Sequence, residues 1–161
     1  MVMTLCSEVL KRLEGKTLVT AESLTGGGIG NALTAVPGAS AVYKGGVISY
    51  VNEVKRDVLG VSQEILDRYG AVSPWTAGAM ASGVRKLLKA DYAVSVTGLA
   101  GPTGDEFGNP VGTVYIGIAS ARGVRSERFQ APDPSTRESV RNAAAVRALE
   151  LLYGEGRLLV N

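Results

Sequence analysis

The feature that most constrains the fold of this chain is a run of small residues over positions 21–28, AESLTGGG. A β-branched segment at 18–20 precedes the run, and a helical pattern at 29–33 follows it. This order predicts a turn between a buried strand and a helix. Open α/β sheets bind ligands at the carboxyl ends of their strands, so this turn is a candidate functional site.

The residues of the turn limit its chemistry. Three consecutive glycines at 26–28 accept positive φ angles and place free N–H groups at the start of a helix. Such groups suit a bound anion, or the oxyanion that forms when the hydroxyl of Ser23 attacks a carbonyl carbon. The alternative is that Ser23 or Thr25 caps the helix and the glycines only form the turn. The run matches neither the dinucleotide fingerprint nor the phosphate loop.

The chain contains no histidine. Serine–histidine and cysteine–histidine catalysis are therefore excluded, together with every metal site that needs an imidazole. A catalytic serine in this chain would be activated by a lysine, a tyrosine, a carboxylate or a terminal amine. Tyr50 ends an expected strand over 42–50, and Lys55 lies early in an expected helix over 53–59, so both can face one crevice.

Strand and helix patterns alternate along most of the chain and end in a hairpin. They predict an α/β fold, a three-layer α/β/α sandwich with a mixed, mostly parallel sheet, in one domain over 1–161. A glycine-rich loop at 98–110 follows the clearest buried strand and brings a second small-residue loop to the same edge. The expected strands are 17–21, 42–50, 92–97, 111–119 and 124–129, and the expected helices are 4–13, 29–34, 53–59, 63–69, 73–89 and 136–153.

Composition sets the expected surroundings of the protein. The net charge is +2, and the lysines and arginines are spread along the chain, so we expect no nucleic-acid partner. The single cysteine, Cys6, cannot form an internal disulfide. The sequence has no signal-peptide pattern and no long apolar span, which predicts a cytoplasmic protein with no membrane partner.

Six ordered motifs cover nearly the whole chain. They are AESxTGG at 21–27, VPGxS at 36–40, GGVISYxNxxK at 45–55, GAVS at 70–73, VTGLAGP at 96–102 and PVGTV at 110–114. With these motifs the chain resembles the CinA C-terminal domain family. The resemblance implies an α/β/α sandwich that hydrolyses nicotinamide mononucleotide to nicotinic acid mononucleotide and ammonia, with no metal and no redox cofactor.

The resemblance also implies roles for individual residues. Ser23 is the expected nucleophile, and Tyr50 and Lys55 are the pair expected to activate it. Lys55 can act as a base in its neutral form, and Tyr50 is expected to relay a proton between Lys55 and Ser23 or to lose its own proton beside the lysine. The expected substrate-binding residues are Thr25, Gly26, Gly27, Gly28, Asn52, Thr97, Gly98, Gly101 and Arg137.

The phosphate of such a substrate needs an anion site. The candidates are the helix start at 26–28, the loop at 98–104 and Arg137, which is expected near the start of the last helix. Arg141 lies one turn later and could share or take over the role. The resemblance further implies a homo-oligomer, and a stand-alone form without the N-terminal domain that many family members carry.

Four positions, in three segments, depart from the family's usual pattern. Leu24 stands where the family usually has cysteine, Asn109 where it has lysine, and Ser135-Thr136 where it has Gly-Asp. Two further hypotheses therefore stay open beside the leading one. The chain could be a nucleotide- or phosphate-binding module that acts through a protein partner without hydrolysis, or an amidohydrolase for a related carboxamide.

Overall fold

The computed structural model describes residues 2–133 and 135–160, with side chains described as far as residue 155. The helices are α1 (Val2–Arg12), α2 (Gly28–Thr34), α3 (Asn52–Asp57), α4 (Gln63–Tyr69), α5 (Pro74–Leu88) and α6 (Arg137–Val160), with a short 3₁₀ turn at Ala39–Ala41. The strands are β1 (Leu18–Glu22), β2 (Tyr43–Ile48), β3 (Tyr92–Gly98), β4 (Thr113–Ser120) and β5 (Gly123–Gln130).

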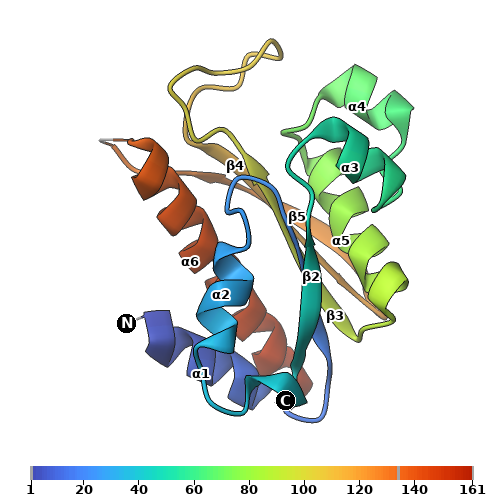
Figure 1. Ribbon diagram of the computed structural model, residues 1–161, viewed down its shortest axis with the longest axis vertical. Helices are drawn as coiled ribbons and strands as arrows, with labels where there is room; N and C mark the ends of the chain where they lie inside the picture. Colours follow the sequence, from blue (N-terminus) through green and yellow to red (C-terminus); the bar gives the residue numbers. More distant parts are fainter. Residues whose placement is uncertain (1, 134, 161) are drawn as a thin grey trace.

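The five strands form one mixed sheet in the order β2-β1-β3-β4-β5. Strand β1 is parallel to both β2 and β3, whereas β4 is antiparallel to β3 and to β5. The carboxyl ends of β1, β2 and β3 therefore meet at one edge of the sheet (Figure 1). Residues that directly follow these three strands are brought together there.

Helices cover both faces of the sheet. Helices α1, α2 and α6 pack together on one face, and α5 packs on the other, with α4 against α5 (Figure 1). One cluster of buried side chains fills each interface. Leu13, Ile29 and Leu149 belong to the first, and Val19, Met80 and Val84 belong to the second. Burial of apolar surface on both faces of a sheet explains why β1 and most of β3 are continuously buried.

The expected α/β/α sandwich with a mixed sheet is confirmed. Two of the four strand pairings are parallel, and two are antiparallel. The reason lies in the connection after β3, which is the loop at 99–112 and contains no helix. A parallel crossover usually needs a helix, so the chain returns as an antiparallel strand instead. Strand β4 begins at Thr113, two residues later than expected, because Gly112 takes a φ of 90° in a turn.

Local capping follows the sequence. The hydroxyl of Ser62 accepts a hydrogen bond from the amide of Ile65 at the start of α4. Ser73 caps α5 in the same way, and Pro74 occupies the first helical position, where its missing N–H has no cost. None of the helices described is long and apolar enough to cross a membrane.

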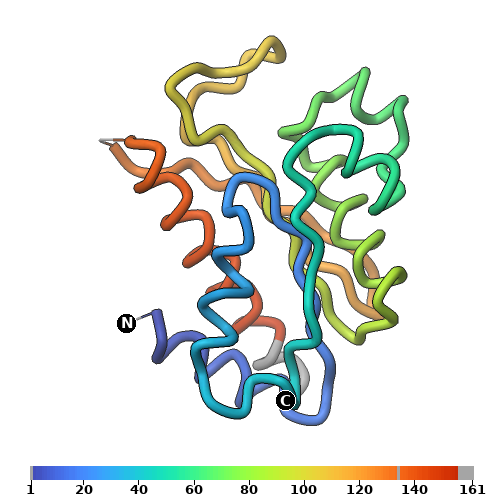
Figure 2. The backbone as a smooth tube through the Cα atoms, viewed as in Figure 1, coloured from blue at the N-terminus to red at the C-terminus, as the bar shows by residue number. Residues whose placement is uncertain are grey.

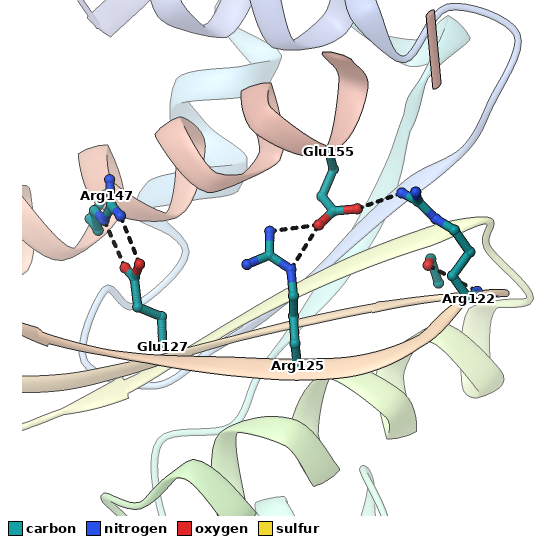
Figure 3. Close-up of polar contacts among 6 residues, drawn as sticks. Arg122, Arg125, Glu127, Arg147 and Glu155 are labelled. Atoms are coloured by element: carbon teal, nitrogen blue, oxygen red, sulfur yellow. Dashed lines mark hydrogen bonds and ion pairs between the residues drawn. The ribbon is translucent and has the colours of Figure 1, made fainter. Parts of the chain in front are cut away.

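Two ion-pair groups fix α6 on the β4–β5 hairpin (Figure 3). The carboxylate of Glu127 binds the guanidinium of Arg147 with oxygen–nitrogen distances of 2.8 and 2.7 Å. Near the end of the helix, the buried carboxylate of Glu155 accepts hydrogen bonds from Arg122 and Arg125. These contacts anchor the C-terminal half of α6, and the same helix carries its first residues toward the carboxyl ends of the parallel strands (Figure 1).

Candidate functional site

The turn after β1 lies at the carboxyl edge of the sheet. Three segments surround this edge: the turn itself, the loop at 99–112 and the segment that holds α3 and α4 (Figure 2). The amide of Ser23 still hydrogen-bonds to the carbonyl of Val96 in β3, at 3.0 Å, so the serine is held by the sheet. Its side chain is only 6% exposed.

Ser23 contacts Lys55 directly. The Nζ atom of Lys55 donates to Ser23 Oγ at 2.9 Å, to the carbonyl of Ser49 at 2.7 Å and to the carbonyl of Tyr50 at 3.2 Å. Lys55 projects from α3, the helix that follows β2, and is 1% exposed. None of the ion pairs among the described residues includes it.

The environment of Lys55 makes its neutral form more accessible than that of an exposed lysine. Burial lowers the pKa of the Lys55 ammonium from its ordinary 10.5 to about 8, because a charged group loses hydration inside the protein. Its hydrogen-bond partners are two carbonyls and a hydroxyl, which carry no formal charge to offset that loss. A lysine of this kind can accept a proton from a neighbouring hydroxyl near neutral pH.

Tyr50 contributes its main chain to the Ser23–Lys55 pair. Its carbonyl lies 3.2 Å from Lys55 Nζ and 3.5 Å from Ser23 Oγ. The side chain is 56% exposed, and its hydroxyl accepts a hydrogen bond from Arg137 Nη2 at 2.8 Å. The expected relay through the Tyr50 hydroxyl does not match this geometry, because Lys55 reaches Ser23 without an intermediate.

Arg137, the first residue of α6, joins two sides of the site. Besides Tyr50, its guanidinium donates to the carbonyl of Gly101 at 2.7 Å, in the loop after β3. Thr97 is buried in β3 and donates its hydroxyl to the carbonyl of Ala71 at 2.8 Å. These contacts join the segments that follow β2 and β3 to α6.

The glycine turn differs from the expectation. The amides at the start of α2 are already occupied: the buried carboxylate of Glu22 accepts from Ile29 and Gly30, at 2.8 and 3.0 Å, and from the hydroxyl of Thr25. A bound anion therefore has no free helix amide at 29–30. This role of Glu22 was not predicted from the sequence, although a carboxylate seven residues before a helix amide is suited to neutralise a helix N-terminus.

Two amides beside the nucleophile remain available. The amides of Gly26 and Gly28 donate to the carbonyls of Ser23 and Thr25, within the turn. Among the described residues, no hydrogen bond uses the amide of Leu24 or that of Thr25. The donors nearest in sequence to Ser23 are thus not the glycine amides that the sequence indicated.

A cavity of about 300 Å³ opens over Ser23 and Lys55. Four expected binding residues line it: Thr97, Gly98, Gly101 and Arg137. Thr25 and Gly28 instead line a groove of about 800 Å³ between α2 and α6, with Arg137 and Arg141. Gly27 and Asn52 line two other hollows, and Gly26 lies beside the guanidinium of Arg141.

The departures at 24 and 109 have visible structural roles. Leu24 is a buried core side chain that also lines the cavity. The side-chain amide of Asn109 donates to the carbonyl of Val72 at 3.1 Å and to the carboxylate of Asp105 at 2.9 Å. Asn109 therefore anchors the loop after β3 to the segment before α5. The segment 135–136 ends in Thr136, whose hydroxyl accepts from the amide of Ser139 at the start of α6.

The fold and site define a class of protein: an α/β/α sandwich with a buried serine–lysine pair at the carboxyl edge of its parallel strands. Residues 2–155 match the model of the CinA C-terminal domain, and the chain belongs to this family. A CinA-like protein of Synechococcus is 50% identical over 98% of this chain, and one of Thermosynechococcus vestitus is 47% identical over 98%. The chain spans 37% and 38% of the lengths of these relatives.

Solved structures agree with this assignment. A CinA superfamily protein from Klebsiella pneumoniae has a TM-score of 0.93 and is 33% identical, with 98% of both chains covered. The competence/damage inducible protein CihA from Agrobacterium tumefaciens has a TM-score of 0.90 and is 39% identical, with 95% of this chain and 94% of that one covered.

Proposed function

We propose that this chain is a nicotinamide-nucleotide amidohydrolase that converts nicotinamide mononucleotide and water to nicotinic acid mononucleotide and ammonia. The observation that carries the proposal is the 2.9 Å contact between Lys55 Nζ and Ser23 Oγ in a buried site that gives the lysine no carboxylate partner. The family membership supports the choice of substrate, since the motifs around both residues are those on which the resemblance rests.

The reaction proceeds in two halves. Neutral Lys55 takes the hydroxyl proton of Ser23 as Oγ bonds to the carboxamide carbon, and the carbonyl oxygen becomes an oxyanion. As this intermediate collapses, the carbon–nitrogen bond breaks, and protonated Lys55 returns its proton to the leaving nitrogen, which departs as ammonia. Water then attacks the acyl-enzyme with Lys55 again as base, and the products are a carboxylic acid and free Ser23.

Arg137 is the proposed contact for the phosphate of the substrate. Its guanidinium lines the cavity and holds only an exposed hydroxyl and a main-chain carbonyl, at Tyr50 and Gly101. A dianionic phosphate is a stronger acceptor for arginine than either group, so substrate can replace one of these hydrogen bonds. The proposed ligand of the protein is thus a small nucleotide. The chain is further proposed to form a homo-oligomer.

Ammonia release from nicotinamide mononucleotide by purified protein tests the proposal. The parent should release ammonia, and Ser23→Ala and Lys55→Met should reduce the rate by at least about 1,000-fold, because each removes a partner of a two-residue unit. Ser82→Ala and Lys44→Met are matched controls at exposed positions outside the cavity and should keep the parent rate.

Two results would redirect the interpretation. Binding of the nucleotide without ammonia release by the parent would favour the nucleotide-binding module that acts through a partner. Release from another carboxamide, but not from nicotinamide mononucleotide, would favour an amidohydrolase of different specificity with the same serine–lysine chemistry.

A further inference from the structure

Arg141 holds the main chain of the nucleophile turn. It lies on α6, one turn after Arg137, and its Nε donates to the carbonyl of Leu24 at 2.9 Å. The contact joins residues 117 positions apart in the sequence. Arg141 does not line the cavity over Ser23; it borders the groove between α2 and α6 and contacts the turn from there.

The hydrogen bond between Arg141 and the Leu24 carbonyl fixes the direction of the Thr25 N–H. A trans peptide group is planar, and its C=O and N–H point in opposite directions. Because the Leu24 carbonyl is directed at Arg141, the N–H of Thr25 points away from Arg141. In the same way, the Ser23 carbonyl accepts from the amide of Gly26, which fixes the N–H of Leu24. Both fixed N–H groups are without a hydrogen-bond partner among the described residues.

Several other donors near the serine are already in use. Glu22 occupies the amides of Ile29 and Gly30, and the amide of Gly28 donates to the carbonyl of Thr25. Among the described residues of the turn, the amides of Leu24, Thr25 and Gly27 have no hydrogen-bond partner, and those at 24 and 25 are the nearest in sequence to Ser23. Preorganised amides of this kind stabilise an oxyanion more than groups that must reorient during the reaction.

Arg141 is itself held at a fixed place. Further along α6, Arg147 is paired with Glu127, and Glu155 is paired with Arg122 and Arg125 (Figure 3). These pairs fasten the helix to the β4–β5 hairpin, and the hairpin belongs to the same sheet as Ser23. The guanidinium of Arg141 therefore supports the turn after β1 from a helix that is itself fixed to the sheet.

We propose that Arg141 is a positioning residue that orients the Leu24–Thr25 peptide as part of the oxyanion site of Ser23. The inference rests on the proposed hydrolysis at Ser23. It concerns stabilisation of the transition state, so it predicts an effect on kcat rather than on substrate affinity.

The test compares Arg141→Lys and Arg141→Gln with the parent and with Arg128→Lys, a matched change at an exposed position of β5 away from the turn. Both Arg141 variants should lower kcat by about 10- to 100-fold, less than the loss of a whole oxyanion donor, while KM changes by less than about threefold. The pH dependence should keep its midpoint, because Lys55 keeps its three hydrogen bonds. Arg128→Lys should match the parent.

A second readout does not depend on the natural substrate. Pyridine-3-boronic acid can form a bond between its boron and Ser23 Oγ while Lys55 takes the hydroxyl proton, which gives a tetrahedral boronate anion with an oxygen at the oxyanion position. Its affinity, measured by calorimetry, should fall in each Arg141 variant by the same factor as kcat/KM, since both depend on the oxyanion site. Circular dichroism and the thermal midpoint establish that each variant is folded.

The outcomes separate this inference from the proposed function. An active parent with unchanged kcat in Arg141→Gln overturns the role of Arg141 alone, as does a rise in KM at constant kcat, which would make Arg141 a substrate-binding residue. A parent that is inactive on nicotinamide mononucleotide, yet binds the boronate more tightly than Arg141→Gln does, overturns the proposed function and supports the inference. A parent with neither activity nor boronate binding overturns both.

Discussion

Lys55 Nζ lies 2.9 Å from Ser23 Oγ, and its other two hydrogen bonds go to the main-chain carbonyls of Ser49 and Tyr50. Burial lowers the pKa of this lysine, and none of the ion pairs among the described residues supplies a counter-charge that would hold a proton on it. A serine next to a partly neutral lysine is an activated nucleophile. In the proposed reaction this pair would carry out, without histidine, the proton transfer for which many hydrolases use an imidazole.

The rate should follow the titration of Lys55. Its pKa is lowered to about 8 by burial, and only the neutral amine can accept the Ser23 proton. Below this pKa, kcat/KM should rise about tenfold per pH unit, and above it the rate should level off. Steady-state ammonia release between about pH 6 and pH 10 measures the profile. A rate that is independent of pH over this range would exclude Lys55 as the base.

Tyr50→Phe tests the side-chain hydroxyl of Tyr50 separately from its main-chain carbonyl. The substitution removes the hydroxyl that binds Arg137 and keeps the carbonyl that contacts Lys55. We expect KM to rise by roughly threefold to tenfold, because Arg137 loses a partner that orients it, while kcat and the midpoint of the pH profile stay close to those of the parent.

A proton relay through the Tyr50 hydroxyl predicts a different result. Loss of a group that transfers a proton in the transition state lowers kcat by about 100- to 10,000-fold. Such a fall in Tyr50→Phe, in a protein with an unchanged thermal midpoint, would restore the relay. Arg137→Gln is the companion variant, and it should raise KM at least as much as Tyr50→Phe because it removes the proposed phosphate contact itself.

The sequence was sufficient for those parts of the molecule that depend on local pattern. The elements and the gathering of Ser23 with Lys55 at the ends of parallel strands follow from periodicity and strand order. The antiparallel direction of β4 relative to β3 does not follow from the sequence, because the order of apolar residues in a buried strand is the same whichever way the strand runs.

The internal partners of the turn depend on contacts that no local pattern encodes. Glu22 sits at the end of a buried strand, where its carboxylate could have pointed to either face, and only the packing of α2 turns it to the helix amides. Arg141 reaches Leu24 from a helix more than one hundred residues away. Tyr50 was correctly located beside the pair, yet the atom that contacts Lys55 is its carbonyl oxygen, which a sequence motif cannot specify.

Two glycines in helices should respond oppositely to alanine. At Gly83 in α5, an added methyl group would overlap the carbonyl of Leu59, which leads into α4. Gly83→Ala should lower the free energy of unfolding by about 1–3 kcal/mol, because main chain must move to make room. At Gly154 in α6 an added methyl group would lie in open space, so Gly154→Ala should raise the free energy of unfolding by about 1 kcal/mol through helix propensity.

Urea denaturation of the two variants beside the parent measures both effects. Destabilisation by Gly154→Ala would contradict the gain expected from helix propensity. A Gly83→Ala protein as stable as the parent would show that the close contact between α5 and the segment before α4 does not form in solution, since the structure leaves no volume for its methyl group.

The buried lysine should also make stability depend on pH, with a definite sign. The pKa of Lys55 is about 8 in the folded protein and 10.5 in an exposed side chain, so between these values the unfolded chain binds a proton that the folded one does not. Stability therefore rises with pH across this window, and below it the buried ammonium is a constant cost. The full change corresponds to about 3 kcal/mol.

Lys55→Met cannot titrate at this position, so the difference in unfolding free energy between parent and Lys55→Met isolates the effect. That difference should grow in favour of the parent from pH 8 to pH 10.5 and stay level below pH 8. A difference that does not vary with pH would mean that Lys55 keeps its ordinary pKa, and the proposed base would then be almost fully protonated at neutral pH.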